Sequence, residues 1–243
     1  MMNPEEKPVP ADHSLALDES VMQRGNHIWF ALPPGFVEIP FGSLLAEPGS
    51  EEARKMIEAV RELLQLVPLE QHEAFLGQLS QAQGLLALLR KDGTVHCSLG
   101  VHGGDEGGVL QSVFTLTWRE TPWTPRRISA VRAATARESA SGIEMLDLPC
   151  GPGTIAETVV ETPASVDPLQ RSLYQATAYL PHPDGQRLAV LALGTTAVEA
   201  REHYRDMLRA IAHMVSFDNP LPEELREQIP ESEVAASVRA VFG

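Results

Sequence analysis

Apolar residues recur at helical spacing in two neighbouring blocks of the first half of the chain. In the first block, Met56, Val60 and Leu63 repeat every three or four residues after Ser50, a residue type suited to a helix N-cap. The second block carries leucines at similar spacing and ends at Gly93. A proline between the blocks stops one helix and suits the first turn of the next. The pattern therefore predicts an αα-hairpin near residues 51–91.

An alternating pattern of period two begins at Val95. The odd positions from Val95 to Val101 are apolar, whereas His96 and His102 fall on the opposite face. This alternation predicts a half-buried strand that carries two half-exposed histidines. A second alternating run leads to Trp118 after the glycine-rich residues 103–108, so the two runs predict an antiparallel hairpin.

Further strands are predicted after a short helix near residues 128–137. Their ranges are about 143–148, 154–162, 172–181 and 187–194. The run from Leu188 to Leu193 is apolar at both parities, as expected for a central strand covered on both faces. A first short strand is predicted at His27–Phe30.

The segment after the last of these strands carries a signal for the start of a helix. Thr196 and Glu199 fit the Thr-x-x-Glu capping box, in which each side chain accepts a hydrogen bond from the other residue's backbone. Tyr204, Leu208 and Ile211 then form an apolar stripe. We therefore predict a helix that begins at the capping box and packs through this stripe.

Strands arranged in hairpins, with helices in separate blocks, predict an α+β fold in which an antiparallel sheet packs against helices. Residues 1–25 contain three prolines and no sustained period, and we predict them to be disordered. Residues 26–219 are predicted to form a single α+β domain. Prolines then punctuate residues 220–243, for which we predict a linker and a short amphipathic C-terminal helix.

The last third of the chain resembles the close of the PsbP/Mog1-like domains. The resemblance rests on an apolar strand after a Pro-Asp-Gly turn, a helix, and the ending Ile211-Ala212-His213-Met214-Val215-Ser216-Phe217. It implies an antiparallel sheet sandwiched by helices, a fold used generally for binding and accessory roles. No catalytic residue follows from the resemblance.

Composition narrows the class of partner. The 243 residues carry a formal charge of −14, and 43% of them are hydrophobic. An acidic chain with scattered arginines weighs against nucleic acid as the main partner. The sequence offers no run long and apolar enough for a membrane span and only two cysteines. We therefore expect a cytoplasmic protein with reduced thiols, bound neither to nucleic acid nor to a membrane.

The common catalytic and metal-binding motifs are absent from the sequence, so we expect no catalytic residue, no cofactor and no metal site. His96 and His102 stand about 20 Å apart along an extended strand, too far to share one ion. The loop at 103–108 lacks the ending of a phosphate-binding loop. Cys97 is predicted to be a small core residue, and Cys150 lies in a turn with no cation beside it in sequence.

Two segments are candidates for binding a partner protein. Residues 118–127 hold two of the three tryptophans together with three arginines, residue types common at the centres of interfaces. The candidate residues there are Trp118, Trp123, Arg126 and Arg127. The alternative places Trp118 in the core and the arginines in solvent. The second candidate is the predicted C-terminal helix, which can dock on a partner or on its own domain through Val234, Val238 and Phe242.

These observations favour a non-enzymatic accessory protein, such as an adaptor, a chaperone-like factor or a subunit of an assembly, that acts through protein contacts. The alternative is a small-molecule-binding protein or an enzyme whose site assembles on the sheet, because catalytic groups are defined by their positions in space and not by motifs alone. The sequence leaves the oligomeric state open.

Overall fold

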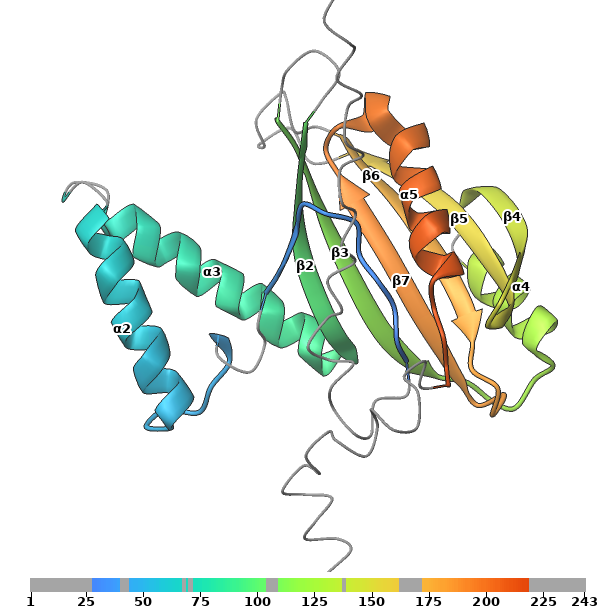
Figure 1. Cartoon of the computed structure of the whole chain (residues 1–243), viewed down its shortest axis with the longest axis horizontal. Helices are drawn as coiled ribbons and strands as arrows, with labels where there is room; N and C mark the ends of the chain where they lie inside the picture. The colour runs from blue at the N-terminus through green and yellow to red at the C-terminus, as the bar shows by residue number, and fades with distance from the viewer. Residues whose placement is uncertain are drawn as a thin grey trace, which may run out of the picture.

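The computed structural model describes residues 28–39, 44–66, 69, 72–103, 109–136, 139–161 and 172–218 (Figure 1). The strands within these ranges are β1 (Phe36–Glu38), β2 (Thr94–Gly103), β3 (Val109–Glu120), β4 (Ser141–Leu148), β5 (Gly151–Glu161), β6 (Ser172–Pro181) and β7 (Arg187–Thr195). The helices are α2 (Glu51–Leu66), α3 (His72–Lys91), α4 (Arg126–Thr135) and α5 (Arg201–His213), with a 3-10 turn at Val198–Ala200.

The strands form one antiparallel sheet in the order β1-β2-β3-β7-β6-β5-β4. Neighbours within β1–β3, and within β4–β7, are consecutive in sequence, so each group is a meander. The pairing of β3 with β7 joins the two meanders, and α4 lies in the connection from β3 to β4. The α+β class and the antiparallel sheet are thus confirmed.

Helices cover the two faces of the sheet unequally. Helix α5 lies across the face visible in Figure 1, where Tyr204, Leu208 and Ile211 join the main core with the inward side chains of β3, β7 and β6. Helix α4 packs on the other face, where Ala134 meets Tyr179 and residues of β5 and β7. The predicted apolar stripe of α5 is therefore confirmed, and α4 covers a part of the second face that includes residues of β5, β6 and β7.

The N-terminal end of the described chain also packs on the α5 face. Ile28 and Phe30 are buried in the main core, and the backbone of Trp29 exchanges two 2.8 Å hydrogen bonds with that of Ser216. This contact is an isolated bridge. The prediction of a first strand at His27–Phe30 was therefore wrong for its described residues, and the first strand is β1.

Helix α2 begins at the predicted N-cap. The Ser50 hydroxyl accepts a 3.1 Å hydrogen bond from the backbone N–H of Ala53, which satisfies one of the free donors of the first turn. Helix α3 contacts α2 where the Gln83 amide reaches the Met56 sulfur at 3.6 Å. Because residues 67, 68, 70 and 71 between the helices lie outside the described ranges, the αα-hairpin stays a prediction.

The predicted capping box of α5 was wrong. The chain forms a 3-10 turn at Val198–Ala200 before α5 begins at Arg201, and no side chain caps either element. The hydroxyl that binds the backbone here belongs to Thr195, which accepts a 3.1 Å hydrogen bond from the N–H of Ala197. The N-cap position of the turn is Ala197, so Thr196 lies one residue too early in the chain to cap it.

The predicted disordered segment 1–25 and the predicted linker and helix at 220–243 lie outside the described residues, and the boundaries of the central domain stay predictions. No helix in the described part of the chain is long and apolar enough to cross a membrane.

Leu116 tests the junction between the two meanders. It is 1% exposed and lies opposite Leu191 in the β3–β7 ladder. We expect Leu116→Ala to lower the free energy of unfolding by about 2–5 kcal/mol, because it leaves a cavity in the core. Leu85→Ala, on the exposed side of α3, should change it by less than about 0.5 kcal/mol. Urea denaturation of both variants measures the difference, and equal effects would contradict this packing.

Candidate protein-interaction surface

Trp118 is an inward-facing residue of β3. Its ring packs against the main core, with the rings of His182 and Phe217 at centroid distances of 5.9 and 6.3 Å. The Arg187 guanidinium lies 5.3 Å from the ring centroid. Trp118 is thus only partly accessible, and most of its contacts are within the chain.

Arg126 is held by backbone carbonyls and is not a solvated side chain. Its guanidinium donates to the carbonyl oxygen of Pro181 at 2.9 Å and to that of Cys150 at 2.6 Å. A Cβ atom added to Gly151 would collide with this guanidinium, so the glycine leaves the space that Arg126 fills. Arg126, the first residue of α4, therefore links the helix by hydrogen bonds to the β4–β5 turn and to the end of β6.

Trp123 and Arg127 are the accessible members of the predicted patch. Trp123 is 70% exposed. Arg127 projects into solvent and forms a 3.0 Å ion pair with Asp147, which is also exposed. The candidate residues of segment 118–127 thus divide into two that support the fold and two on the surface. Val234, Val238 and Phe242 lie outside the described residues.

Most side chains of strand β2 face the side opposite to the one that the sequence pattern predicted; Cys97, which is buried, is the exception. His96 is 4% exposed and Ser98 is fully buried, whereas Leu99 and Val101 are 39% and 45% exposed. The prediction of two half-exposed histidines was therefore wrong for His96, although His102 is only partly buried. The alternation itself is present, and its polar side faces the α5 side of the sheet.

Contacts with Phe30 and Phe36, far away in the sequence, explain why the two imidazoles can face inward. His96 packs edge-on against Phe30 at a centroid distance of 5.0 Å and forms a 2.6 Å hydrogen bond with the Ser98 hydroxyl. His102 lies 5.1 Å from the ring of Phe36 and 3.3 Å from the hydroxyl of Ser112. Burial, followed by the nearby His203, lowers the pKa of His102, which favours the neutral ring.

Four of the exposed aliphatic side chains of β1, β2 and β3 lie close together on the opposite side, and we call them the outer apolar patch. Its members are Val37 at 66%, Leu99 at 39%, Val101 at 45% and Val113 at 43% exposure. Val37 pairs directly with Leu99, which pairs directly with Val113, so one row crosses three strands. Side chains at paired positions lie about 5 Å apart on the same face. The patch is therefore contiguous.

The buried polar groups of β2 do not form an accessible catalytic site. The order of groups resembles an acid–histidine–serine relay, because Glu38 lies 3.8 Å from Nδ1 of His96 and Ser98 lies at Nε2. The Ser98 hydroxyl, however, is wholly enclosed, and a substrate cannot reach it while the sheet is intact. Across the described residues, no three His, Cys, Asp or Glu side chains are grouped to hold a metal ion.

The two thiols differ in accessibility. Cys97 is 2% exposed, and burial raises its pKa to about 11, which agrees with its predicted place in the core. Cys150 is half-buried, and burial raises its pKa while Arg126 opposes that rise. The sequence search missed this cation because Arg126 is 24 positions away in the chain.

Comparisons with known proteins give one weak likeness of fold. No protein-family model matches the sequence, and no curated protein matches it. The structure of the Saccharomyces cerevisiae Ran-binding protein Mog1p is similar at 12% identity and a TM-score of 0.39. The match covers 79% of this chain and 91% of that one, so it is not confined to the last third, where the sequence resemblance was found. At this level the likeness concerns the fold alone.

Separate replacement of Arg126 and Arg127 tests whether the first arginine supports the fold and the second does not. We expect Arg126→Ala to destabilise the fold by about 1.5–3 kcal/mol, because two carbonyls lose a charged donor. Arg127→Ala should cost less than about 1 kcal/mol, since its ion pair is exposed. Thermal and urea unfolding of both variants provide the measurement. A larger loss for Arg127→Ala would contradict these contacts.

Thiol labelling tests the burial of Cys97. With a pKa near 11, about one Cys97 side chain in a thousand is a thiolate at pH 8, and the sheet shields it further. We expect Cys97→Ala, which retains Cys150, to react with an aromatic disulfide reagent at least tenfold faster than Cys150→Ala. Both variants should react at similar rates in urea. Equal rates in the folded state would show that Cys97 is accessible.

Proposed function

We propose that this chain is a non-enzymatic accessory protein, an adaptor, chaperone-like factor or assembly subunit of the cytoplasm, that binds another protein. The outer apolar patch carries the proposal. Four aliphatic side chains are exposed on a regular sheet, while Thr94, His96 and Ser98 of β2 are buried. A contiguous apolar surface of this kind is typical of a site that a partner covers.

The arrangement favours contact with a protein surface over a small ligand. The paired row Val37, Leu99 and Val113 belongs to a sheet face, and the patch contains no charged member. Binding removes such side chains from water and gains about 25 cal/mol per Å² of buried apolar area. Trp123 and Arg127, exposed beyond β3, are of the types that dominate many interfaces and are proposed as a second contact.

Co-purification with two matched triple variants tests the proposal. Leu99→Thr, Val101→Thr and Val113→Thr together replace three of the four patch members with threonine, a β-branched residue that suits strands. The control is Val159→Thr, Val160→Thr and Leu173→Thr, at positions of similar exposure on β5 and β6. A partner recovered from the native host is identified and purified, and its Kd is measured. We expect the patch variant to raise Kd at least tenfold and the control less than twofold.

A Kd that is unchanged in the patch variant would contradict the proposal. Loss of binding on Trp123→Ala with Arg127→Ala alone would move the contact to the second surface. Loss on removal of residues 220–243 alone would move it to the C-terminal segment. Either result would overturn the assignment to the outer apolar patch.

A further inference from the structure

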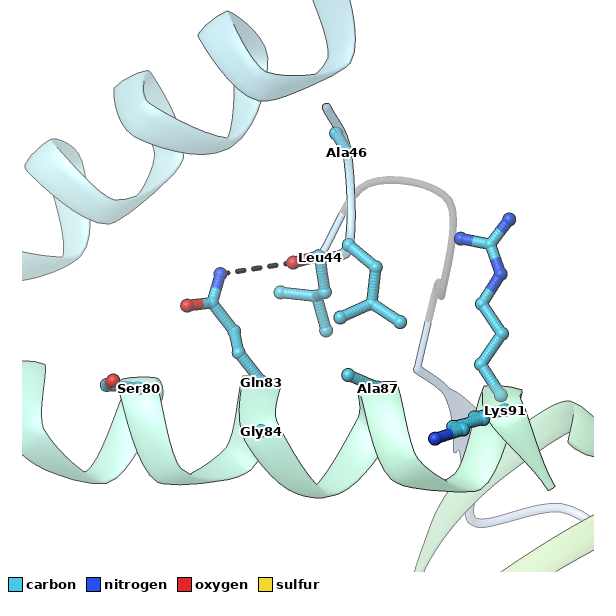
Figure 2. Close-up of a pocket in the computed structure, with 9 residues that line it drawn as sticks. Leu44, Ala46, Ser80, Gln83, Gly84, Ala87 and Lys91 are labelled. Carbon is cyan, nitrogen blue, oxygen red and sulfur yellow. Dashed lines mark hydrogen bonds between the residues drawn. The ribbon is translucent and has the colours of Figure 1, made fainter. Parts of the chain in front are cut away.

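A groove lies between α3 and the segment that precedes α2. Its volume is about 690 Å³, and it is lined by Leu44, Leu45 and Ala46 of that segment and by residues of α3. Figure 2 shows Leu44 directed toward α3, while the Gln83 side chain crosses to the loop. The Gln83 amide donates a 3.0 Å hydrogen bond to the carbonyl oxygen of Leu44, which fixes the distance between the two walls.

The α3 wall of the groove is one continuous helix face. Ser80, Gln83, Gly84 and Ala87 are spaced by three, four and seven residues, and such positions lie above one another on a helix. These side chains are small or absent apart from Gln83. A Cβ atom on Gly84 would meet no other heavy atom within 4 Å, so the groove is open at that position.

Charge distinguishes one end of this groove. Its lining includes two cations, Arg90 and Lys91, and no acidic side chain. The neighbouring Asp92 is already paired with Arg119. Within the described part of the chain, neither Arg90 nor Lys91 forms an ion pair. The whole chain has 33 acidic residues against 19 Lys and Arg, so this end is a local reversal of the overall sign.

Both cations also lie in the last turn of α3, where positive charge is favourable toward the helix dipole. That role alone requires no groove beside them. It predicts that reversing the charges changes stability but no binding property. Arg132, in the last turn of α4, has the same relation to its helix and lies outside the groove. It therefore provides a control for the effect of reversing a charge at the end of a helix.

We propose that this groove binds an acidic segment of a partner protein, with one apolar side chain between Leu44 and Ala87 and a carboxylate at Arg90 and Lys91. The charge complementarity selects this occupant over a neutral or basic one. Leucines on the loop wall and cations at one end of the groove fit a peptide in which an aliphatic or aromatic residue stands close to Asp or Glu. The site is separate from the outer apolar patch and shares no residue with it.

Peptide selection on the full chain tests the proposal. A phage-displayed library of random 12-residue peptides is panned against the immobilised protein, and the most enriched peptide is labelled for fluorescence anisotropy. We expect enriched peptides to combine Leu, Ile or Phe with Asp or Glu. Arg90→Glu with Lys91→Glu should raise the Kd of that peptide at least tenfold, whereas Arg132→Glu should change it less than twofold. Binding should weaken with added salt.

Substitutions at two glycines of α3 distinguish loss of binding because the groove is filled from loss of binding because the helix is disturbed. Gly84→Leu puts a side chain into the groove, and Gly77→Leu puts one on the same helix outside it, where a Cβ also has open space. Both changes favour the helix, so both variants should stay folded with an unchanged or raised Tm. We expect Gly84→Leu to raise the Kd of the peptide at least tenfold and Gly77→Leu to leave it unchanged.

Several results would overturn the proposal. They are the absence of any enriched peptide, enrichment without acidic residues, or a Kd insensitive to Gly84→Leu. A peptide that binds only after residues 220–243 are removed would show that the chain's own acidic segment occupies the groove. Peptides that lose binding with the Leu99, Val101 and Val113 variant, and not with Gly84→Leu, would support the outer apolar patch and reject the groove.

Discussion

The ladder between β3 and β7 is the contact on which the rest of this structure depends. Each of the two meanders is made by connections between consecutive strands, but β3 and β7 are brought together from distant parts of the chain. Phe114 lies opposite Leu193, and Leu116 opposite Leu191, and all four side chains are buried. The chain between β3 and β7 must close a long loop before these strands can pair, and this closure costs conformational entropy. Burial of the core side chains offsets that cost, so the pairing joins the two meanders into one sheet.

Helix α5 stabilises the sheet that this ladder creates. Its apolar stripe packs on the joined strands, while Arg205 forms 2.8 Å ion pairs with Glu144 of β4 and Glu157 of β5. The helix therefore links the central core to the edge of the second meander. On the opposite side of β2 and β3, Cys97 is buried, but Leu99, Val101 and Val113 are exposed. The unequal covering of the two faces produces the outer apolar patch.

Sequence patterns predicted the elements of this fold well where the deciding forces are local. The Ser50 cap and the four strands of the second meander are present close to the expected residues. The alternation along β2 was also present, but a period of two cannot say which side faces the core. Here the imidazoles of His96 and His102 pack against the rings of Phe30 and Phe36, which are distant in sequence. The inversion is thus a tertiary property that the strand's own residues do not encode.

Contacts between residues distant in sequence also decided how well the candidate sites could be predicted. Tryptophan and arginine are frequent at interfaces, but composition could not separate Arg126, whose donors are taken by two carbonyls, from Arg127 in solvent. The groove beside α3 could not be found from the sequence, because its lining combines a loop with one helix face and its only signal is the small size of Gly84 and Ala87. Binding surfaces arise where the fold leaves apolar or charged groups without internal partners, and that balance exists only once the chain is folded.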